Sequence, residues 1–91
     1  MQRVADTFGV SLEKMLGRDR SRQFALPRQI AMYILRQEAN ISLPQIGEKL
    51  GGRDHTTVMY GCDKVADLLE RDDRIRRQVL EIKEHLYGPG N

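Results

Sequence analysis

The segment GGRDHTTV, residues 51–58, concentrates hydrogen-bonding side chains in one short stretch of a small protein. Asp54 accepts hydrogen bonds, and His55 can both donate and accept them. Thr56 and Thr57 each carry a hydroxyl and a methyl group. Side chains of these types can distinguish donors, acceptors and methyl groups on a ligand, so they indicate recognition of a patterned polar surface.

Catalysis and metal binding fit the same residues less well. A neighbouring Asp-His pair is weak evidence for a catalytic dyad, because no nucleophile and orienting group can be assembled beside it. A metal site would need four side chains, Asp54, His55, Cys62 and Asp63, which show no CxxC or HxxxH spacing. The chain also lacks a GxxxxGKS or GxxxxGKT stretch for nucleotide phosphates. We expect no catalytic residue, no metal and no cofactor in this chain.

Two amphipathic helices joined by a tight turn position the segment. Ser42 and Gln45 have capping-box spacing, and Pro44 fits a first turn. The stripe that this helix should bury is Leu43, Ile46, Gly47 and Leu50.

The second helix of the pair follows the glycines. Asp54 can cap it, and its apolar positions Val58, Cys62, Val65 and Leu69 step by four, three and four. The pattern predicts a helix-turn-helix at about 43–71, with residues 54–57 on the first turn of the second helix. Asp54 and Thr57 could equally be no more than local caps.

The rest of the chain also reads as helices, because no stretch alternates apolar and polar residues. We expect helices at about 2–8 and at 11–16, the second capped by Ser11 and stopped by Gly17, a polar loop at 18–22, a helix with Pro27 in its first turn that stops near Asn40, and a last helix ended by Gly88. The helix that contains Pro27 should bury Leu26, Ile30, Tyr33 and Ile34, and the last helix should bury Ile75, Val79, Ile82 and Leu86. The prediction is one all-α domain of about six helices over residues 1–91.

Composition bounds the class of protein. The chain has 91 residues, of which 31% are charged and 40% apolar, as in an ordinary folded domain. No apolar run approaches the ~20 residues that cross a bilayer. The single cysteine, Cys62, fits a reducing compartment and reads as a small buried filler. We expect a cytoplasmic protein.

Positive charge is concentrated in one part of the chain. Residues 18–36 contain five arginines and one acid, Asp19, although the net charge of the whole chain is only +2. A charge run alone is more often a solvated face. Beside a helix-turn-helix it indicates a surface for a polyanion.

Double-stranded DNA is the polyanion that this arrangement fits. A recognition helix presents its first turn to base edges in the major groove. There Asp54 can accept from a cytosine amino group, His55 can donate or accept, and the Thr56 methyl can pack on a thymine methyl. Thr57, Gly61 and Lys64 share a helix face, so Thr57 and Lys64 could reach phosphates past a position with no side chain.

The string IGEKLGGRDHTTVMYGCDKV, residues 46–65, resembles the signature of the C-terminal DNA-binding domain, domain IV, of the bacterial chromosomal replication initiators of the DnaA family. The resemblance extends to SRQFALPRQIAMYILR and NISLPQIG upstream. It implies a Trp-repressor-like helix-turn-helix fold and, as ligand, duplex DNA with boxes of TTATCCACA type at replication origins. It also implies nucleoid association, and an ATP-binding AAA+ module upstream in full-length initiators.

The resemblance assigns roles to individual residues. Base contacts fall on Asp54, His55 and Thr56 in the major groove, on Pro44 from the preceding helix, and on Arg20 in the minor groove. Phosphate contacts fall on Arg22, Arg28, Gln29, Arg53, Thr57 and Lys64, although Arg53 could instead orient Asp54. Leu26 stands where some relatives carry arginine, and Asp19 should weaken the local potential.

The expected partners come from the same resemblance. They are origin DNA bound by a monomer, neighbouring initiator domains and regulatory proteins, and transcriptional autoregulation through the same boxes is a further expectation. Two other functional classes remain open from the residues alone. The chain could be a free-standing transcription regulator, or a helical adaptor whose arginines bind an acidic partner or an anionic membrane.

Overall fold

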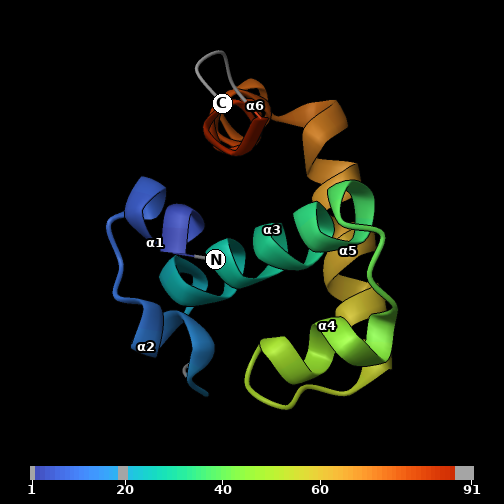
Figure 1. The fold of residues 1–91 in the computed structure, drawn as a ribbon. Helices are drawn as coiled ribbons and strands as arrows, with labels where there is room; N and C mark the ends of the chain where they lie inside the picture. Colours follow the sequence, from blue (N-terminus) through green and yellow to red (C-terminus); the bar gives the residue numbers. More distant parts are fainter. Residues whose placement is uncertain (1, 19–20, 88–91) are drawn as a thin grey trace.

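A computed structural model describes residues 2–18 and 21–87, and within them the chain forms six helices and no strand (Figure 1). The helices are α1 (Gln2–Phe8), α2 (Leu12–Leu16), α3 (Arg22–Glu38), α4 (Leu43–Lys49), α5 (His55–Arg71) and α6 (Asp73–Tyr87). The predicted all-α fold is confirmed. Across the described ranges, no helix is both long and apolar enough to cross a membrane.

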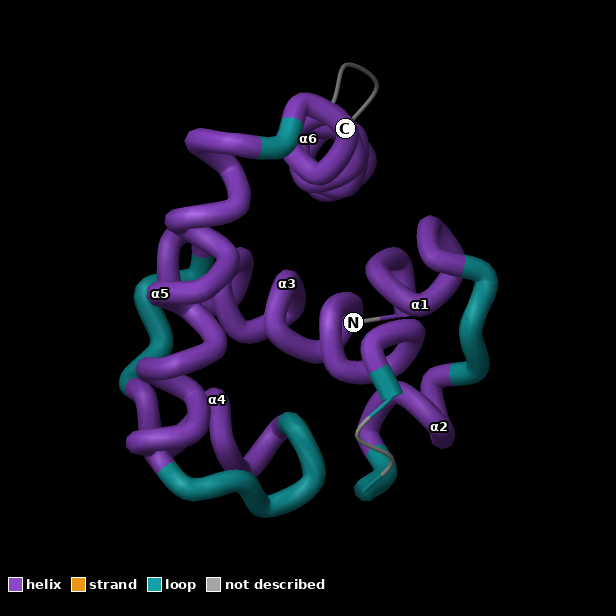
Figure 2. The backbone as a smooth tube through the Cα atoms, turned by 180° about the vertical axis from the view of Figure 1, so that it is seen from behind, coloured by secondary structure: helices purple, strands orange, loops and turns teal. Residues whose placement is uncertain are grey.

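Helix α3 runs through the middle of the molecule, and the other helices are arranged around it (Figure 2). Helices α1 and α2 pack on its first half, α5 crosses it, and α6 contacts both α1 and α5. The largest fully buried side chains come from every helix from α2 to α6 and from the end of α4: Met15, Pro27, Ile30, Met32, Ile46, Leu50, Val58, Val65 and Ile82. One continuous core therefore holds the helix-turn-helix against the rest of the fold.

The predicted caps of α2, α4 and α5 and the predicted stop of α3 near Asn40 are confirmed. The Ser11 hydroxyl accepts from the Lys14 amide at 3.1 Å, and Ser42 and Gln45 form the full capping box at the start of α4. The Asp54 carboxylate accepts from the Thr56 amide at 3.1 Å at the start of α5. Asn40 has a φ of 54°, the left-handed conformation that commonly ends a helix, two residues after α3 stops.

The prediction for the start of α3 was wrong. The helix begins at Arg22, inside the segment expected to be a loop, and Pro27 lies beyond its first turn. Pro27 has no amide hydrogen to donate to the carbonyl of Gln23, so the helix forgoes one bond. The proline ring and Phe24 are both buried, which offsets that loss with apolar contacts.

The core face of α3 also differs from the predicted one. Ile30 and Ile34 are buried as expected, but Leu26 and Tyr33 are only partly buried. The face extends instead to Phe24, Ala31 and Met32, because α3 is covered by α1 and α2 on one side and by α5 on the other. Cys62 is likewise half-buried at the edge of the core, where burial raises the pKa of its thiol.

Gly61 has a different purpose from the predicted one. A Cβ atom at this position would lie 2.5 Å from the sulfur of Met32 and 3.3 Å from Cγ of Gln29. The missing side chain therefore allows α5 to approach α3 closely. The predicted reach of Thr57 and Lys64 to phosphates stays a prediction.

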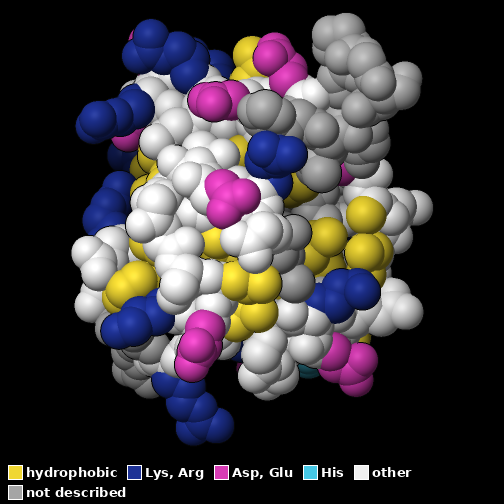
Figure 3. Space-filling view, turned by 60° about the vertical axis from the view of Figure 1, so that its left-hand side comes forward, with side chains coloured by type: hydrophobic (Ala, Val, Ile, Leu, Met, Phe, Trp, Pro, Cys, Tyr) yellow, Lys and Arg dark blue, Asp and Glu magenta, His cyan; other side chains and the backbone are white. Residues whose placement is uncertain are grey.

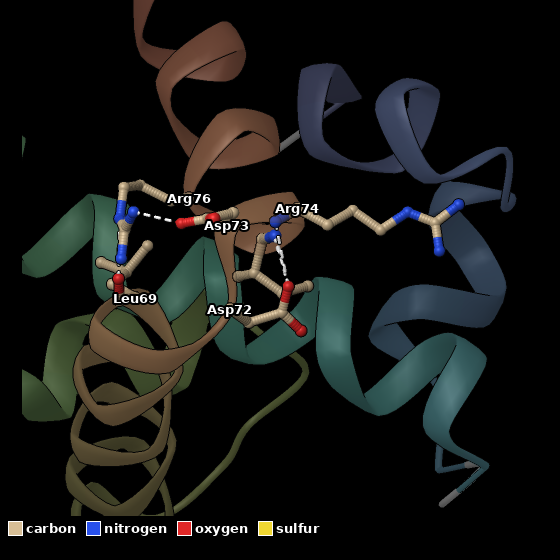
Figure 4. Close-up of polar contacts among 6 residues, drawn as sticks. Leu69, Asp72, Asp73, Arg74 and Arg76 are labelled. Atoms are coloured by element: carbon tan, nitrogen blue, oxygen red, sulfur yellow. Dashed lines mark hydrogen bonds and ion pairs between the residues drawn. The ribbon is translucent and has the colours of Figure 1, made fainter.

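A polar corner joins α5 to α6 (Figure 4). Asp72 accepts from the backbone amides of Arg74 and Ile75, which caps the start of α6. Arg76 donates to the carbonyl of Leu69 at 2.9 Å and pairs with Asp73. Ile75, Val79 and Ile82 of α6 are buried as predicted, while the Leu86 side chain and Gly88 lie outside the described residues.

The turn between α4 and α5 is anchored on one carbonyl. The Gly47 carbonyl accepts from the amides of Leu50 at 3.2 Å, Gly52 at 3.0 Å and Arg53 at 2.8 Å. Gly51 and Gly52 have φ values of 81° and 78°, which favour glycine. A Cβ atom at Gly47 would overlap the Arg53 carbonyl oxygen, so the turn lies directly against α4.

Replacing Gly47 with alanine should lower the free energy of unfolding by roughly 3 kcal/mol, because a backbone carbonyl cannot move aside as a flexible side chain can. The matched change Gly52→Ala, where a Cβ atom would meet nothing within 4 Å, should cost only about 1 kcal/mol of left-handed strain. Urea denaturation followed by circular dichroism measures both values. Equal losses in the two variants would contradict the tight contact between the turn and α4.

Candidate nucleic-acid interface

The first turn of α5 carries the predicted base-reading side chains at the surface. One oxygen of Asp54, Oδ1, accepts from the Thr56 amide and lies 3.4 Å from Nδ1 of His55. The Asp54 and His55 side chains are 65% and 63% exposed, and Thr56 is exposed as well. Asp54 therefore belongs both to the helix cap and to the exposed polar cluster. Its side chain stays at the surface while it caps α5.

Pro44 is exposed on the first turn of α4, the helix before the turn. Its neighbour Leu43 lines a hollow of about 310 Å³ with Met59 and Cys62 of α5. The start of α4 therefore lies beside the middle of α5, with which α4 is in contact.

A second hollow, of about 600 Å³, is lined by Thr57 on the first turn of α5. Its walls come from the end of α2, from α3, from the turn and from α5, and they include Arg18, Arg28, Arg53 and Thr57. Three arginines and a threonine hydroxyl around one hollow form a site that attracts an anion.

Arg28 is buried, with only 7% of its surface exposed. Its Nε donates to the carbonyl of Met15 at 2.7 Å, which ties α3 to the end of α2. The predicted phosphate contact by Arg28 stays a prediction. Because the side chain also holds two helices together, replacing it with alanine would disturb the fold as well as any ligand contact.

Arg53 is half-buried, and its guanidinium donates to three backbone carbonyls. Nη1 donates to Leu16 at 3.2 Å and to Leu50, and Nη2 donates to Gly17. Burial, together with the positive charge of Arg18, lowers the pKa of Arg53. In the described residues the Arg53 side chain makes no hydrogen bond to Asp54, whose carboxylate is oriented by the Thr56 amide.

The remaining predicted phosphate contacts lie around the same region. Arg22 is exposed at the start of α3, and Lys64 is exposed on α5. Gln29 is partly buried and lies beside Gly61, where α3 and α5 meet. Arg20 and Asp19 lie outside the described residues, so the predicted minor-groove contact stays a prediction.

Arg18 was missed as a site residue by sequence reasoning. It was counted in the arginine-rich segment, yet its type and position there do not distinguish it from its neighbours. It is exposed on the wall of the larger hollow. Basic and acidic side chains are mixed over the face that Figure 3 presents, so positive charge does not cover the protein uniformly.

Comparisons with known proteins agree with this geometry. Residues 1–65 match the family described as bacterial dnaA protein helix-turn-helix. The chain is 49% identical over 86 residues to the chromosomal replication initiator protein DnaA of Chloroflexus aurantiacus, which covers 94% of the chain. It is 51% identical over 88 residues to the protein of that name from Roseiflexus castenholzii, covering 97% of the chain.

The relative from Thermomicrobium roseum, also named chromosomal replication initiator protein DnaA, is 51% identical over 84 residues and covers 92% of the chain. In each of these three comparisons the chain spans 18% of the length of the relative. The match of the family over residues 1–65 contains α1 to α4, the turn and the first part of α5. This chain therefore belongs to the bacterial DnaA helix-turn-helix family.

Proposed function

We propose that this chain binds double-stranded DNA at replication-origin boxes of TTATCCACA type, as the DNA-binding part of a replication initiator. The observation that carries the proposal is the first turn of α5, where Asp54, His55 and Thr56 are exposed beside an arginine-lined hollow. The names of the relatives, which are replication initiators, support it.

The first turn of α5 reads base edges in the major groove. Asp54 accepts from a cytosine amino group, His55 contacts a base edge through the ring nitrogen that points away from Asp54, and the Thr56 methyl packs on a thymine methyl. Pro44 adds an apolar contact from α4. The core holds α5 rigidly against α3 and α4, which keeps these groups in a fixed register.

The hollow beside the turn holds the DNA backbone. The Thr57 hydroxyl and the Arg18 guanidinium on its walls are suited to a phosphate group, and the amide end of α5 adds favourable charge. Arg22, Gln29 and Lys64 extend the backbone contacts along α3 and α5. These contacts supply affinity that depends on salt but not on sequence.

Arg20 reads the minor groove in this proposal. An arginine is favoured in the narrow minor groove of A·T-rich DNA because the negative potential there is enhanced. Arg18 and Gly17, which precede Arg20, line the hollow beside α5, and this supports an approach of both elements to one duplex. A monomer then reads both grooves, and the asymmetry of the box fixes its orientation.

The wider context belongs to the full-length initiator. An AAA+ module that binds ATP, neighbouring initiator domains and regulatory proteins are its proposed partners, and binding to the same boxes near promoters gives autoregulation of transcription. The domain described here contributes the choice of site.

The chain should bind a labelled TTATCCACA duplex about 10³-fold more tightly than a scrambled duplex of equal composition, because base contacts add to the backbone contacts. Fluorescence anisotropy at two salt concentrations measures both affinities. Equal and steeply salt-dependent binding to the two duplexes would refute sequence-specific recognition and would support only non-specific binding of DNA by the arginines. Preference for acidic vesicles or acidic peptides over either duplex would favour an adaptor.

Thr56→Ala should weaken binding to the box by about 1–3 kcal/mol and act at particular base pairs, because a thymine methyl loses its partner. Thr57→Ala, one residue on, is the matched control and should weaken binding to all sequences by one common factor. Titrations against duplexes with single base-pair changes separate the two patterns. Base preferences left intact by Thr56→Ala would refute the reading role.

Asp54→Asn should leave the free energy of unfolding within about 0.5 kcal/mol of the native value, since asparagine caps helices as well as aspartate does, while Asp54→Ala should lose about 1 kcal/mol. The asparagine variant should nevertheless lose its preference for cytosine at the contacted pair, because its amide can pair with adenine. Urea denaturation and the same duplex panel measure the two effects. An unchanged base preference would show that Asp54 caps the helix but does not contact a base.

A further inference from the structure

The end of α2 and the turn between α4 and α5 are joined by one side chain. Arg53 reaches from the turn to the carbonyls of Leu16 and Gly17 at the end of α2, and it also donates to Leu50 at the end of α4. The last carbonyls of a helix have no partner within that helix. A cation at this negative end is favourable, and Arg53 serves two helix ends at once.

The backbone of the turn passes close enough to the end of α2 for this contact of Arg53 with Leu16 and Gly17, which we call the joint. Gly51 has a φ of 81°, and a Cβ atom on it would lie 2.6 Å from the Leu16 carbonyl oxygen and 2.8 Å from Nη1 of Arg53. The turn therefore touches the end of α2 directly. The backbone amide of Arg53 is itself held by the Gly47 carbonyl at 2.8 Å, which fixes the base of the side chain.

The place of the Arg53 contact in the chain matters. A residue proposed to contact bases follows shortly after each of the two segments that Arg53 connects. Three residues after Gly17 comes Arg20, the proposed minor-groove reader, and three residues after Arg53 comes Thr56, a proposed major-groove reader. The hydrogen bonds of the Arg53 guanidinium therefore connect the two segments from which these readers extend.

We propose that Arg53 is a positioning residue that sets the spacing between the end of α2 and the first turn of α5, and so couples minor-groove to major-groove recognition. This inference rests on the proposed function. It gives Arg53 a role different from the phosphate contact expected from the sequence, because its guanidinium is already directed at protein carbonyls.

An arginine is required for this role. The guanidinium is a planar fork with five N–H donors, so it can serve acceptors on two helices in fixed directions. A lysine ammonium keeps the charge but is a point donor on a flexible stem. A phosphate contact would therefore tolerate Arg53→Lys, whereas the joint would not.

The test is a double-mutant cycle between Arg53 and Arg20, with affinity for the box duplex as readout. In the native background Arg20→Ala should weaken binding by about tenfold or more. In the Arg53→Lys background the same change should weaken binding by less than about twofold, because the end of α2 and the turn are no longer held at a fixed spacing. Thermal melting by circular dichroism checks that each variant folds.

Lys49→Ala is the matched control, since Lys49 is an exposed cation on α4 outside the joint. It should leave the effect of Arg20→Ala unchanged. The proposal is overturned if Arg20→Ala keeps its full effect in the Arg53→Lys background. It is also overturned if Arg53→Ala lowers the salt dependence by about one phosphate, a slope change of about 0.9, without altering the effect of Arg20→Ala.

A measurement without DNA separates this inference from the proposed function. Hydrogen exchange at the Gly17 amide, which donates to the Lys14 carbonyl at 3.2 Å, should speed up at least about tenfold in Arg53→Lys while amides of α6 stay unchanged. Unchanged exchange at Gly17 with an intact box preference overturns the inference alone. Loss of box preference in the native chain overturns the proposed function, and the coupling with it.

Discussion

The guanidinium of Arg53 satisfies carbonyls at the ends of two helices, α2 and α4, and so ties the turn before α5 to the end of α2. Partly buried carbonyls without a partner are costly, so the end of α2 and the turn are held together by the need to satisfy them. Gly47 and Gly51 make the contact possible, because a side chain at either position would meet backbone atoms. The helix-turn-helix is thus built onto the first part of the chain and is not a separate unit.

Features that depend on a few neighbouring residues could be predicted from the sequence. Ser11, Ser42 and Asp54 cap helices through contacts within three residues of themselves, and these were found correctly. The start of α3 was missed because Pro27 is usually a first-turn residue, and only the burial of its ring in the assembled core explains its place inside a helix. Tertiary packing overrode the local preference.

The candidate site shows the same division. The exposed cluster on the first turn of α5 could be predicted. The apolar periodicity places these residues on that turn, and the residue types give their hydrogen-bonding groups. The roles of Arg28 and Arg53 could not, because their acceptors are backbone carbonyls at Met15, Leu16 and Gly17. Every residue has such a carbonyl, and nothing in the sequence marks which ones a distant arginine will reach. An arginine-rich segment therefore does not reveal how many of its charges face outward.

One oxygen of Asp54 both starts α5 and faces His55. The cap of α5 and the proposed recognition surface consequently share this atom. If Asp54 contacts a base, a substitution that changes the preferred base keeps the cap with asparagine, serine or threonine, whereas a residue such as alanine costs about 1 kcal/mol. Helix stability would then favour changes of specificity that keep a capping residue, and so would constrain how the proposed recognition surface can evolve.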